Sequence, residues 1–438
     1  MPVARDSTPY HSGLAYLLPS PMPLAALPRI EVEFLPSGRR ATPASLRTLA
    51  CARLLIPAAA LCLALSGCAN NPSSRETHTA VDPIGLFPMA AYNQDVDHWI
   101  DPSRRDYDQA FLSADDQRAH FEALYARYFG RGANDPSPWN PAYVDAHVYR
   151  QHGSDIVALQ RHRLAWFDNT GKTGKHIGYG ENFRPHTAAW IETIAQNTDV
   201  DQFERAPGYT PAHRAIATGN LLVRELPTMD PSFYDHHLAG EGYPFDNLQI
   251  SAVRPGTPLY VLGSSLDGGW LYVQTPDLQG WVRSEDVGMV NDAFVSTWRG
   301  AIHKALGAVT VALAPVRDSH GAFRFDAPAG SLLPLLPATS AGISNILVPV
   351  RNADGQAIIR TARLSDEQIS PMPLSATPRH LAMLLKSLIG RPYGWGNTGL
   401  NNDCSSELQS IFAAFGVWLP QGNCTKNCLH TMGYEWGL

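Results

Sequence analysis

The chain has 438 residues, of which 44% are hydrophobic and 17% charged, so it is long enough to bury several separate cores. Its net charge is −6, and residues 1–67 hold six arginines against three acids, so the rest of the chain is more acidic still, which argues against a nucleic-acid-binding surface. Glycine and proline number 35 each, which indicates many turns and short strands, and we expect a multidomain α+β protein. The sequence contains no Walker-type glycine loop and no H-E-x-x-H pattern, so we expect no cofactor and no metal.

Residues 1–67 end in the pattern of an export signal. Arg53 precedes an apolar run, Leu54–Leu65, which at about a dozen residues is shorter than the roughly 20 that span a bilayer. The stretch Leu-Ser-Gly-Cys that ends at Cys68 resembles a bacterial lipoprotein signal, which implies that Cys68 is lipidated and becomes the mature N-terminus. The alternative is a buried core helix. Residues 1–47 fit no signal peptide, and we interpret them as an over-extended start.

These features predict an exported envelope protein, held by its lipid on the periplasmic face of a membrane or on the outer membrane. Polar residues 68–90 are expected to form a linker. No cysteine occurs between Cys68 and Cys404, so disulfides do not hold the middle of the chain together. The domains must therefore be stabilised by their own apolar cores.

Residues 91–211 are predicted to form a helical domain. One amphipathic helix is expected to begin at Ser113, its N-cap, and to end at Gly130. The residues on its buried face are Phe121, Leu124, Tyr125 and Tyr128. The stretch Asp97–Trp99 contains a histidine; a metal or catalytic site is one interpretation, and we favour packing or capping.

Two blocks of short strands follow, at residues 212–292 and 293–370. In the first, three strands form a meander that contains Trp270, Tyr272, Trp281 and Arg283. This hairpin pattern resembles bacterial SH3-like domains, which implies a small barrel that helps to bind or position cell-wall peptides. In the second block a hairpin is expected around an Asp-Gly turn, and we interpret the block as a second SH3-like barrel; the alternative is a decorated linker.

Residues 371–438 are expected to begin with two helices. The first has Thr377 as its N-cap and is followed by Gly390. A loop rich in glycine and asparagine then leads to a second helix that starts at Cys404. The apolar positions predicted to face inward on that second helix are Leu408, Ile411, Phe412 and Phe415.

The position of Cys404 is typical of a nucleophile. A thiol attacks as its thiolate, and the free N–H groups and dipole of a helix N-terminus favour an anion there. A neighbouring histidine normally supplies the remaining activation, and backbone N–H groups near the thiol are candidates for an oxyanion hole. The alternative is a cysteine with a purely structural role.

The motifs "RPYGWGN" and "DCSS", followed by an apolar helix, resemble the NlpC-type family of cell-wall cysteine peptidases. The order of a helical domain, two SH3-like domains and a C-terminal catalytic domain resembles one branch of that family. The resemblance implies a papain-like α+β domain that cleaves the γ-D-glutamyl to diamino acid bond of peptidoglycan stem peptides, with Cys404 as the nucleophile. It also implies that Ser405 and Tyr243 bind the substrate. Glu241 and Asp246 are candidates to attract its amine, or else solvated acids of a loop.

The catalytic base is not evident from the sequence. The family expects a histidine on a strand some fifty residues after the cysteine, whereas residues 421–438 show no strand pattern, and we interpret this tail as a truncation or a change of reading frame. His430 is a weak candidate for the base, and His236 and His237 beside Asp235 are interpreted as loop residues. One alternative for the tail is a zinc site, whose ligands would be Cys404, Cys424, Cys428 and His430. Another is a disulfide between Cys424 and Cys428.

Two functions follow from these observations. The first is a lipid-anchored cysteine endopeptidase of the cell wall whose chain, as given, has negligible turnover because the histidine strand is missing. The second is a non-catalytic lipoprotein that binds wall peptides through its SH3-like domains. Both have peptidoglycan stem peptides or muropeptides as partners and the membrane as an anchor through Cys68, and neither binds nucleic acid.

Overall fold

The computed structural model of the chain describes residues 93–205, 208–238 and 242–420, all within one compact unit that comprises residues 87–438. The predicted lipidation residue Cys68, the linker at 68–90 and the tail with His430 lie outside the described residues. Among the helices of the described part, none is both long enough and apolar enough to cross a membrane.

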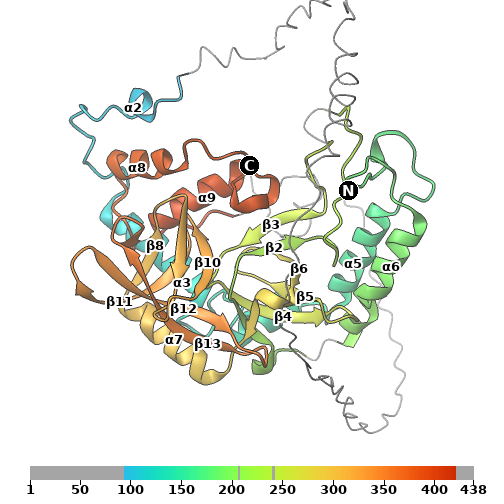
Figure 1. Cartoon of the computed structure of the whole chain (residues 1–438). Coiled ribbons are helices and arrows are strands. Elements are labelled where there is room, and N and C mark those ends of the chain that lie inside the picture. The colour runs from blue at the N-terminus through green and yellow to red at the C-terminus, as the bar shows by residue number, and fades with distance from the viewer. Residues whose placement is uncertain (1–92, 206–207, 239–241, 421–438) are drawn as a thin grey trace, which may run out of the picture. The chain divides into compact units, whose positions relative to one another are not determined.

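Short helices make up the first part of the described chain (Figure 1). The prediction for the helix after Ser113 is confirmed: α3 spans Ala114–Phe129, the Ser113 hydroxyl accepts a hydrogen bond from the Asp116 N–H, and Gly130 has a φ of +65°. The other elements are α2 (Val96–Trp99), α4 (Pro141–Tyr143), η2 (Val144–Val148), α5 (Ser154–Phe167), η3 (Gly174–His176), α6 (Ala188–Thr198), η4 (Val200–Arg205) and η5 (Pro211–His213).

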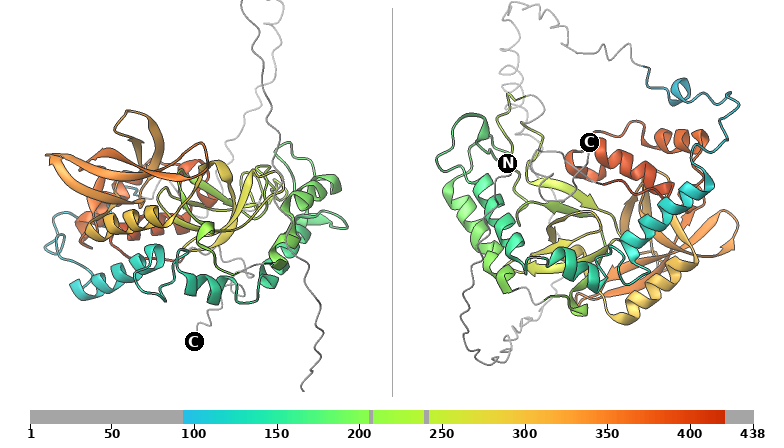
Figure 2. Two further views of the ribbon diagram at one scale, coloured as in Figure 1. Left: turned by 90° about the horizontal axis from the view of Figure 1, so that it is seen from below. Right: turned by 180° about the vertical axis from the view of Figure 1, so that it is seen from behind.

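A seven-stranded antiparallel sheet follows, which we call the first sheet domain. Its strands are β1 (Arg214–Ala217), β2 (Leu221–Arg224), β3 (Gln249–Val253), β4 (Pro258–Ser264), β5 (Trp270–Gln274), β6 (Gln279–Arg283) and β7 (Val287–Met289), with η6 (Ser284–Asp286) before the last. Their spatial order is β3-β2-β6-β5-β4-β1-β7. Trp281 is fully buried and donates a 2.9 Å hydrogen bond from Nε1 to Gln160 on α5, so the sheet and the helical part share a core. Both views in Figure 2 show α5 and α6 beside this sheet.

The second sheet domain begins with a helix, α7 (Asp292–Lys304), which the sequence analysis does not predict. The Asn291 side chain caps it, and Trp298 is fully buried. The strands are β8 (Leu306–Val309), β9 (Leu313–Arg317), β10 (Phe323–Pro328), β11 (Leu332–Ser340), β12 (Ile343–Arg351), β13 (Ala357–Ser365) and β14 (Ile369–Pro371). They form a five-stranded sheet in the order β13-β12-β11-β8-β14 and a β10-β9 pair, and the predicted hairpin is β12–β13, joined by residues 352–356.

The last described segment carries α8 (Pro378–Leu388), η7 (Trp395–Leu400) and α9 (Cys404–Ala414). Thr377 caps α8 and Gly390 has a φ of +80°, as predicted. Residues 372–420 contain no strand, so the described part of the expected papain-like domain consists of these helices and their loops. They pack on one core with α3, α7 and the second sheet; its fully buried aromatic residues include Phe129, Trp139, Trp298 and Phe415.

Candidate active site around Cys404

Cys404 is the first residue of α9, as predicted, and its side chain is exposed. Ile411 and Phe415 of the predicted apolar face are buried. The prediction for Leu408 is wrong, because this side chain is 52% exposed. Leu408 is four residues after Cys404 and therefore lies on the same side of the helix as the exposed thiol.

Asp403 holds the start of α9. Its side chain is only 4% exposed, and Oδ1 accepts hydrogen bonds from the Ser405 and Ser406 N–H groups at 3.1 and 2.8 Å. The Ser406 hydroxyl accepts in turn from the Asp403 N–H, which completes a capping box. The Ser405 and Ser406 N–H groups are therefore already paired with Asp403, and the prediction of an oxyanion hole from backbone N–H groups near Cys404 does not extend to these two.

Tyr393 is the described residue whose side chain interacts with Cys404. Partial burial raises the pKa of Tyr393, and the negative charges of ionised Cys404 and Asp403 act in the same direction. The sequence analysis quotes Tyr393 within "RPYGWGN" but gives it no role. The sequence feature that points to Tyr393 is its position in this motif, about ten residues before Cys404.

A hollow of about 200 Å³ opens beside Tyr393. Arg391, with a cationic side chain, and Glu407, with an anionic one, both line it. The second sheet domain contributes Ala312 and Pro328 to its wall. The hollow therefore has one cationic and one anionic residue in its lining, together with Tyr393, which interacts with Cys404.

The loop that precedes Cys404 is held by the first sheet domain. Gln249 on β3 donates a 2.8 Å hydrogen bond from Nε2 to the Gly396 carbonyl, and both partners are buried. Trp395 donates from Nε1 to the Asp246 carbonyl at 2.9 Å. Gly396 and Asn397 have φ angles of +55° and +65°, so the loop follows a left-handed path that ordinary residues rarely adopt.

Tyr243 lies on the first sheet domain and is 54% exposed. Its ring packs edge-to-face against Phe183 and Phe233, with centroids 5.5 and 5.2 Å apart. The two readings of Asp246 are both wrong, because Oδ2 pairs with Arg224 at 2.8 Å and Oδ1 accepts from two backbone N–H groups. Glu241 lies outside the described residues.

No histidine of the described ranges contacts Cys404. Asp235, His236 and His237 do lie together, with one ligand atom of each within 4.8 Å of the others. All three side chains are substantially exposed, and His237 Nδ1 lies 2.7 Å from Asp235 Oδ1. Their interpretation as loop residues stands. Asp97 pairs with Lys386 at 2.6 Å and Trp99 bonds the Asn93 carbonyl, which agrees with packing and capping at that stretch.

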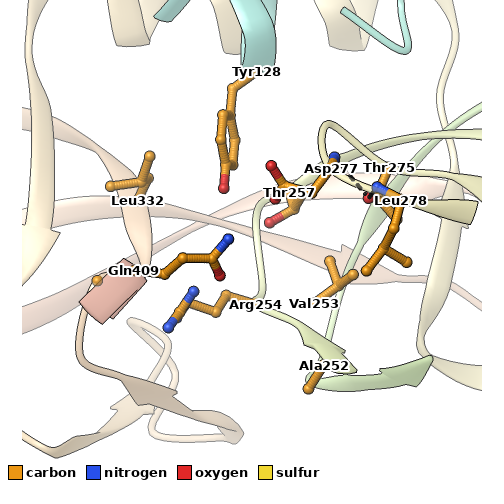
Figure 3. A pocket seen from close by; sticks show the side chains of 11 residues that line it. Tyr128, Ala252, Val253, Arg254, Thr257, Thr275, Asp277, Leu278, Leu332 and Gln409 are labelled. Carbon is orange, nitrogen blue, oxygen red and sulfur yellow. Dashed lines mark hydrogen bonds between the residues drawn. The ribbon is translucent and has the colours of Figure 1, made fainter. Parts of the chain in front are cut away.

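A polar junction lies behind α9, where α3, both sheet domains and α9 meet (Figure 3). Tyr128, Arg254, Asp277 and Gln409 point toward a shared space of about 20 Å³, enough for one water molecule. Asp277 accepts a short hydrogen bond from Trp418 Nε1. Burial raises the pKa of Asp277, against the effect of that bond and of nearby arginines.

This direction predicts a pH dependence of stability. An unfolded aspartate ionises near pH 3.8, whereas folded Asp277 keeps its proton to higher pH, so the folded state binds more protons in between. The free energy of unfolding should therefore fall as pH rises through this window, and Asp277→Asn should remove that contribution. Urea titrations at several values between about pH 4 and 7 measure it.

Asp318 provides a control of opposite sign. Hydrogen bonds from Arg324 lower the pKa of Asp318, so its contribution is present above the unfolded value and is lost as pH falls. Asp318→Asn should therefore lower the free energy of unfolding at neutral pH. The variant should also lose less of that free energy than the native chain as the pH falls into the acid range. An Asp277→Asn variant with the same pH profile as the native chain would contradict the prediction.

Comparisons with known proteins agree with this architecture. Three family models match: the N-terminal NLPC_P60 stabilising domain at residues 58–203, an SH3 domain of SH3b1 type at 231–283 and an SH3 domain of SH3b2 type at 291–340. A solved NlpC/P60 endopeptidase from Photobacterium damselae subsp. piscicida is 26% identical, with a TM-score of 0.60 over 76% of this chain and 69% of that one.

The resemblance of the chain to the NlpC/P60 family is thereby confirmed. The SH3b1-type match falls within the first sheet domain and the SH3b2-type match within the second, so the predicted pair of SH3-like domains is confirmed. An NlpC/P60 protein from Bacillus cereus is 14% identical, with a TM-score of 0.36 over 48% of this chain and 74% of that one. The curated BTB/POZ domain-containing protein 1 of Schizosaccharomyces pombe is 32% identical over 117 residues, and this chain spans 8% of its length.

The family resemblance indicates a cysteine peptidase of the cell wall, which acts outside the cytoplasm. Within this NlpC/P60 chain, the structure brings together Cys404, Asp403, Ser405 and Tyr393. Tyr243 lies on the first sheet domain, two residues before Phe245, whose ring centroid is 6.5 Å from that of Tyr393.

Proposed function

We propose that the chain is a cell-envelope cysteine endopeptidase that hydrolyses the γ-D-glutamyl to diamino acid bond of peptidoglycan stem peptides. The observation that carries the proposal is the exposed thiol of Cys404 at the first position of a capped helix in an NlpC/P60 chain. The helix dipole favours the thiolate at that position, and exposure leaves the thiolate open to a substrate carbonyl.

The reaction divides into two steps. The Cys404 thiolate attacks the glutamyl carbonyl, the C–N bond breaks, and the diamino acid leaves as an amine after it takes up a proton. Water then hydrolyses the thioester and restores the thiol. In the described ranges no histidine is in place to move these protons, so we propose that residues 1–438 by themselves turn over very slowly.

Ser405 is proposed to hold the free amine of the stem peptide. Its hydroxyl donates its single proton to Asp403 Oδ1 at 2.9 Å, so the lone pairs of the oxygen remain to accept hydrogen bonds from an ammonium group. Tyr243 is proposed to contribute an exposed aromatic surface from the first sheet domain. The hollow lined by Arg391 and Glu407 suits a diamino acid, which carries both a carboxylate and an amine.

The site of action is proposed to be the cell envelope, with Cys68 lipidated after export of the chain. The support for this is the sequence pattern at Leu54–Cys68. Metabolic labelling with a fatty-acid probe should label the native chain and not a Cys68→Ser variant. Equal labelling of both would overturn the anchor without affecting the peptidase proposal.

The proposed peptidase site is tested with a purified muropeptide and the native chain. Mass spectrometry of the peptide that contains Cys404 gives the rate of its alkylation by iodoacetamide. A muropeptide at about twice its dissociation constant should slow this alkylation about threefold, because two thirds of the sites are then occupied. The released diamino-acid peptide is measured in the same samples, with Cys404→Ala as the blank.

We expect protection of Cys404, with peptide release close to the blank. Release that depends on Cys404 would support the peptidase and overturn the proposal of slow turnover, and His430→Ala would then test that histidine as the base. Unchanged alkylation together with release equal to the blank would overturn the peptidase proposal for this chain.

The second candidate function is a non-catalytic wall-binding protein. It is favoured by the contrast between two fully formed sheet domains and a described C-terminal segment with no strand and no histidine at Cys404. On this proposal, the native chain and Cys404→Ala bind insoluble peptidoglycan equally, and muropeptide does not protect Cys404.

A further inference from the structure

A residue of the first sheet domain reaches the middle of the nucleophile helix. Arg254 follows β3, and its guanidinium donates a short hydrogen bond to the Ser410 hydroxyl on α9. Ser410 is fully buried, donates a 2.7 Å hydrogen bond to the Ser406 carbonyl and lies 3.4 Å from Asn402 Oδ1. Ser406 and Asn402 are each two residues from Cys404.

Few other contacts hold the Arg254 side chain. Its Nε is buried and has no hydrogen-bond partner, and across the described residues it forms no ion pair within 4.0 Å. Asp277 is the carboxylate whose charge acts on Arg254, and both residues line the polar junction (Figure 3). Asp277 is itself engaged by Trp418, beyond the end of α9. The Ser410 hydroxyl is therefore the group that orients the guanidinium.

The second sheet domain also packs against α9 at Ser410. Gly330 has a φ of +77°, and a Cβ atom at this position would lie 2.7 Å from the Ser410 carbonyl oxygen. Ser410 thus contacts the second sheet domain through its backbone and is hydrogen-bonded to the first sheet domain through its hydroxyl. Close packing on one side means that a change in the Arg254 bond shifts α9 rather than being absorbed by free space.

We propose that Arg254 is a positioning residue for Cys404, which it sets through Ser410, Ser406 and Asn402. This inference rests on the proposed function of Cys404 as the nucleophile. It makes the first sheet domain part of the reactive unit, in addition to any role in binding wall peptides. The polar junction behind α9 then has a purpose, which is to fix the helix whose first residue carries the thiol.

The test is the alkylation rate of Cys404 by iodoacetamide in the intact chain without substrate, measured by mass spectrometry. Arg254→Met keeps the length of the side chain and removes its hydrogen bonds and charge. A looser first turn weakens the favourable effect of the helix N-terminus on the thiolate, so the rate should fall about threefold. Arg254→Lys retains a cationic donor that reaches toward Ser410 and should restore the rate to within about twofold of the native value.

Arg299→Met is the matched control. Arg299 is also a partly buried arginine, and it joins α7 to the Phe129 carbonyl and Asn140 without touching α9. This variant should lose stability and keep the native alkylation rate. Equal slowing by Arg254→Met and Arg299→Met would show general loosening and would overturn the proposal, as would a native rate in Arg254→Met.

Ser410→Ala covers the case in which Arg254→Met does not fold. It removes only the hydroxyl that receives the Arg254 bond, and it should slow alkylation in the same direction, whereas a native rate would overturn the proposal. The alkylation rate is measured without substrate, so the positioning role of Arg254 can be confirmed even if the chain does not cleave muropeptides. Failure here likewise leaves the peptidase proposal standing.

Discussion

Replacing Asp403 with alanine should lower the free energy of unfolding by about 3 kcal/mol, more than the roughly 1 kcal/mol typical of a lost helix cap. The reason is the number of groups that one buried carboxylate satisfies. Asp403 accepts from the Ser405 and Ser406 N–H groups, from the Ser405 hydroxyl and, at 3.2 Å, from the Gly396 N–H. Alanine leaves these donors without partners, and the Ser406 and Gly396 N–H groups among them are buried.

Urea denaturation of the native chain and the variant measures this difference, and two other variants bracket it. Ser113→Ala removes an exposed cap with a single backbone partner and should cost about 1 kcal/mol. Asp403→Asn keeps an acceptor oxygen and should fall between the two. If Asp403→Ala costs no more than Ser113→Ala, the bonds from the loop to Asp403 contribute nothing to stability.

The same substitution should also slow alkylation of Cys404. Without the cap the first turn of α9 frays, and the thiol then lies at the end of a disordered segment rather than at a fixed helix N-terminus. Native alkylation in an Asp403→Ala chain of reduced stability would show that the cap holds the fold and not the thiol.

Local chemistry explains which elements the sequence predicts correctly. Ser113, Thr377 and Asp403 are side chains that cap helices, and each marks the start of a helix within one residue. The same reasoning would have found α7, because Asn291 precedes apolar residues at helical spacing; these are Phe294, Val295, Trp298 and Ile302. Its position between two strand-rich segments masks this helical period.

Contacts between distant segments explain what the sequence cannot predict. Leu408 continues the apolar period of α9 and yet is exposed, because burial depends on which elements surround a helix and not on its pattern alone. The bonds from Gln249 to Gly396 and from Arg254 to Ser410 join residues about 150 positions apart. Neither pair has a local pattern that marks it, so the attachment of the nucleophile loop to the first sheet domain emerges only from the structure.

That attachment leads to the second large effect, which is expected for Gly396→Ala. At the φ of +55° found there, an alanine costs about 1–2 kcal/mol of backbone strain, and its Cβ would lie 2.6 Å from Gln249 Cγ and 3.1 Å from the Gln249 carbonyl oxygen. Overpacking of this kind adds about 1–3 kcal/mol. The free energy of unfolding should therefore fall by about 2–5 kcal/mol, with the lower values expected if the loop detaches from the first sheet domain.

Gly399→Ala separates backbone strain from overpacking. Gly399 lies in the same loop with a φ of +66°, and its Cβ would meet nothing closer than Asn401 Nδ2 at 3.4 Å. It should cost only the backbone strain, about 1–2 kcal/mol, and leave Cys404 alkylation unchanged. Gly396→Ala should change both measurements, since the loop that ends at Cys404 can no longer rest on Gln249. Equal effects of the two alanines would mean that the contact with the first sheet domain does not fix the loop, and the thiol would then depend on α9 and its cap alone.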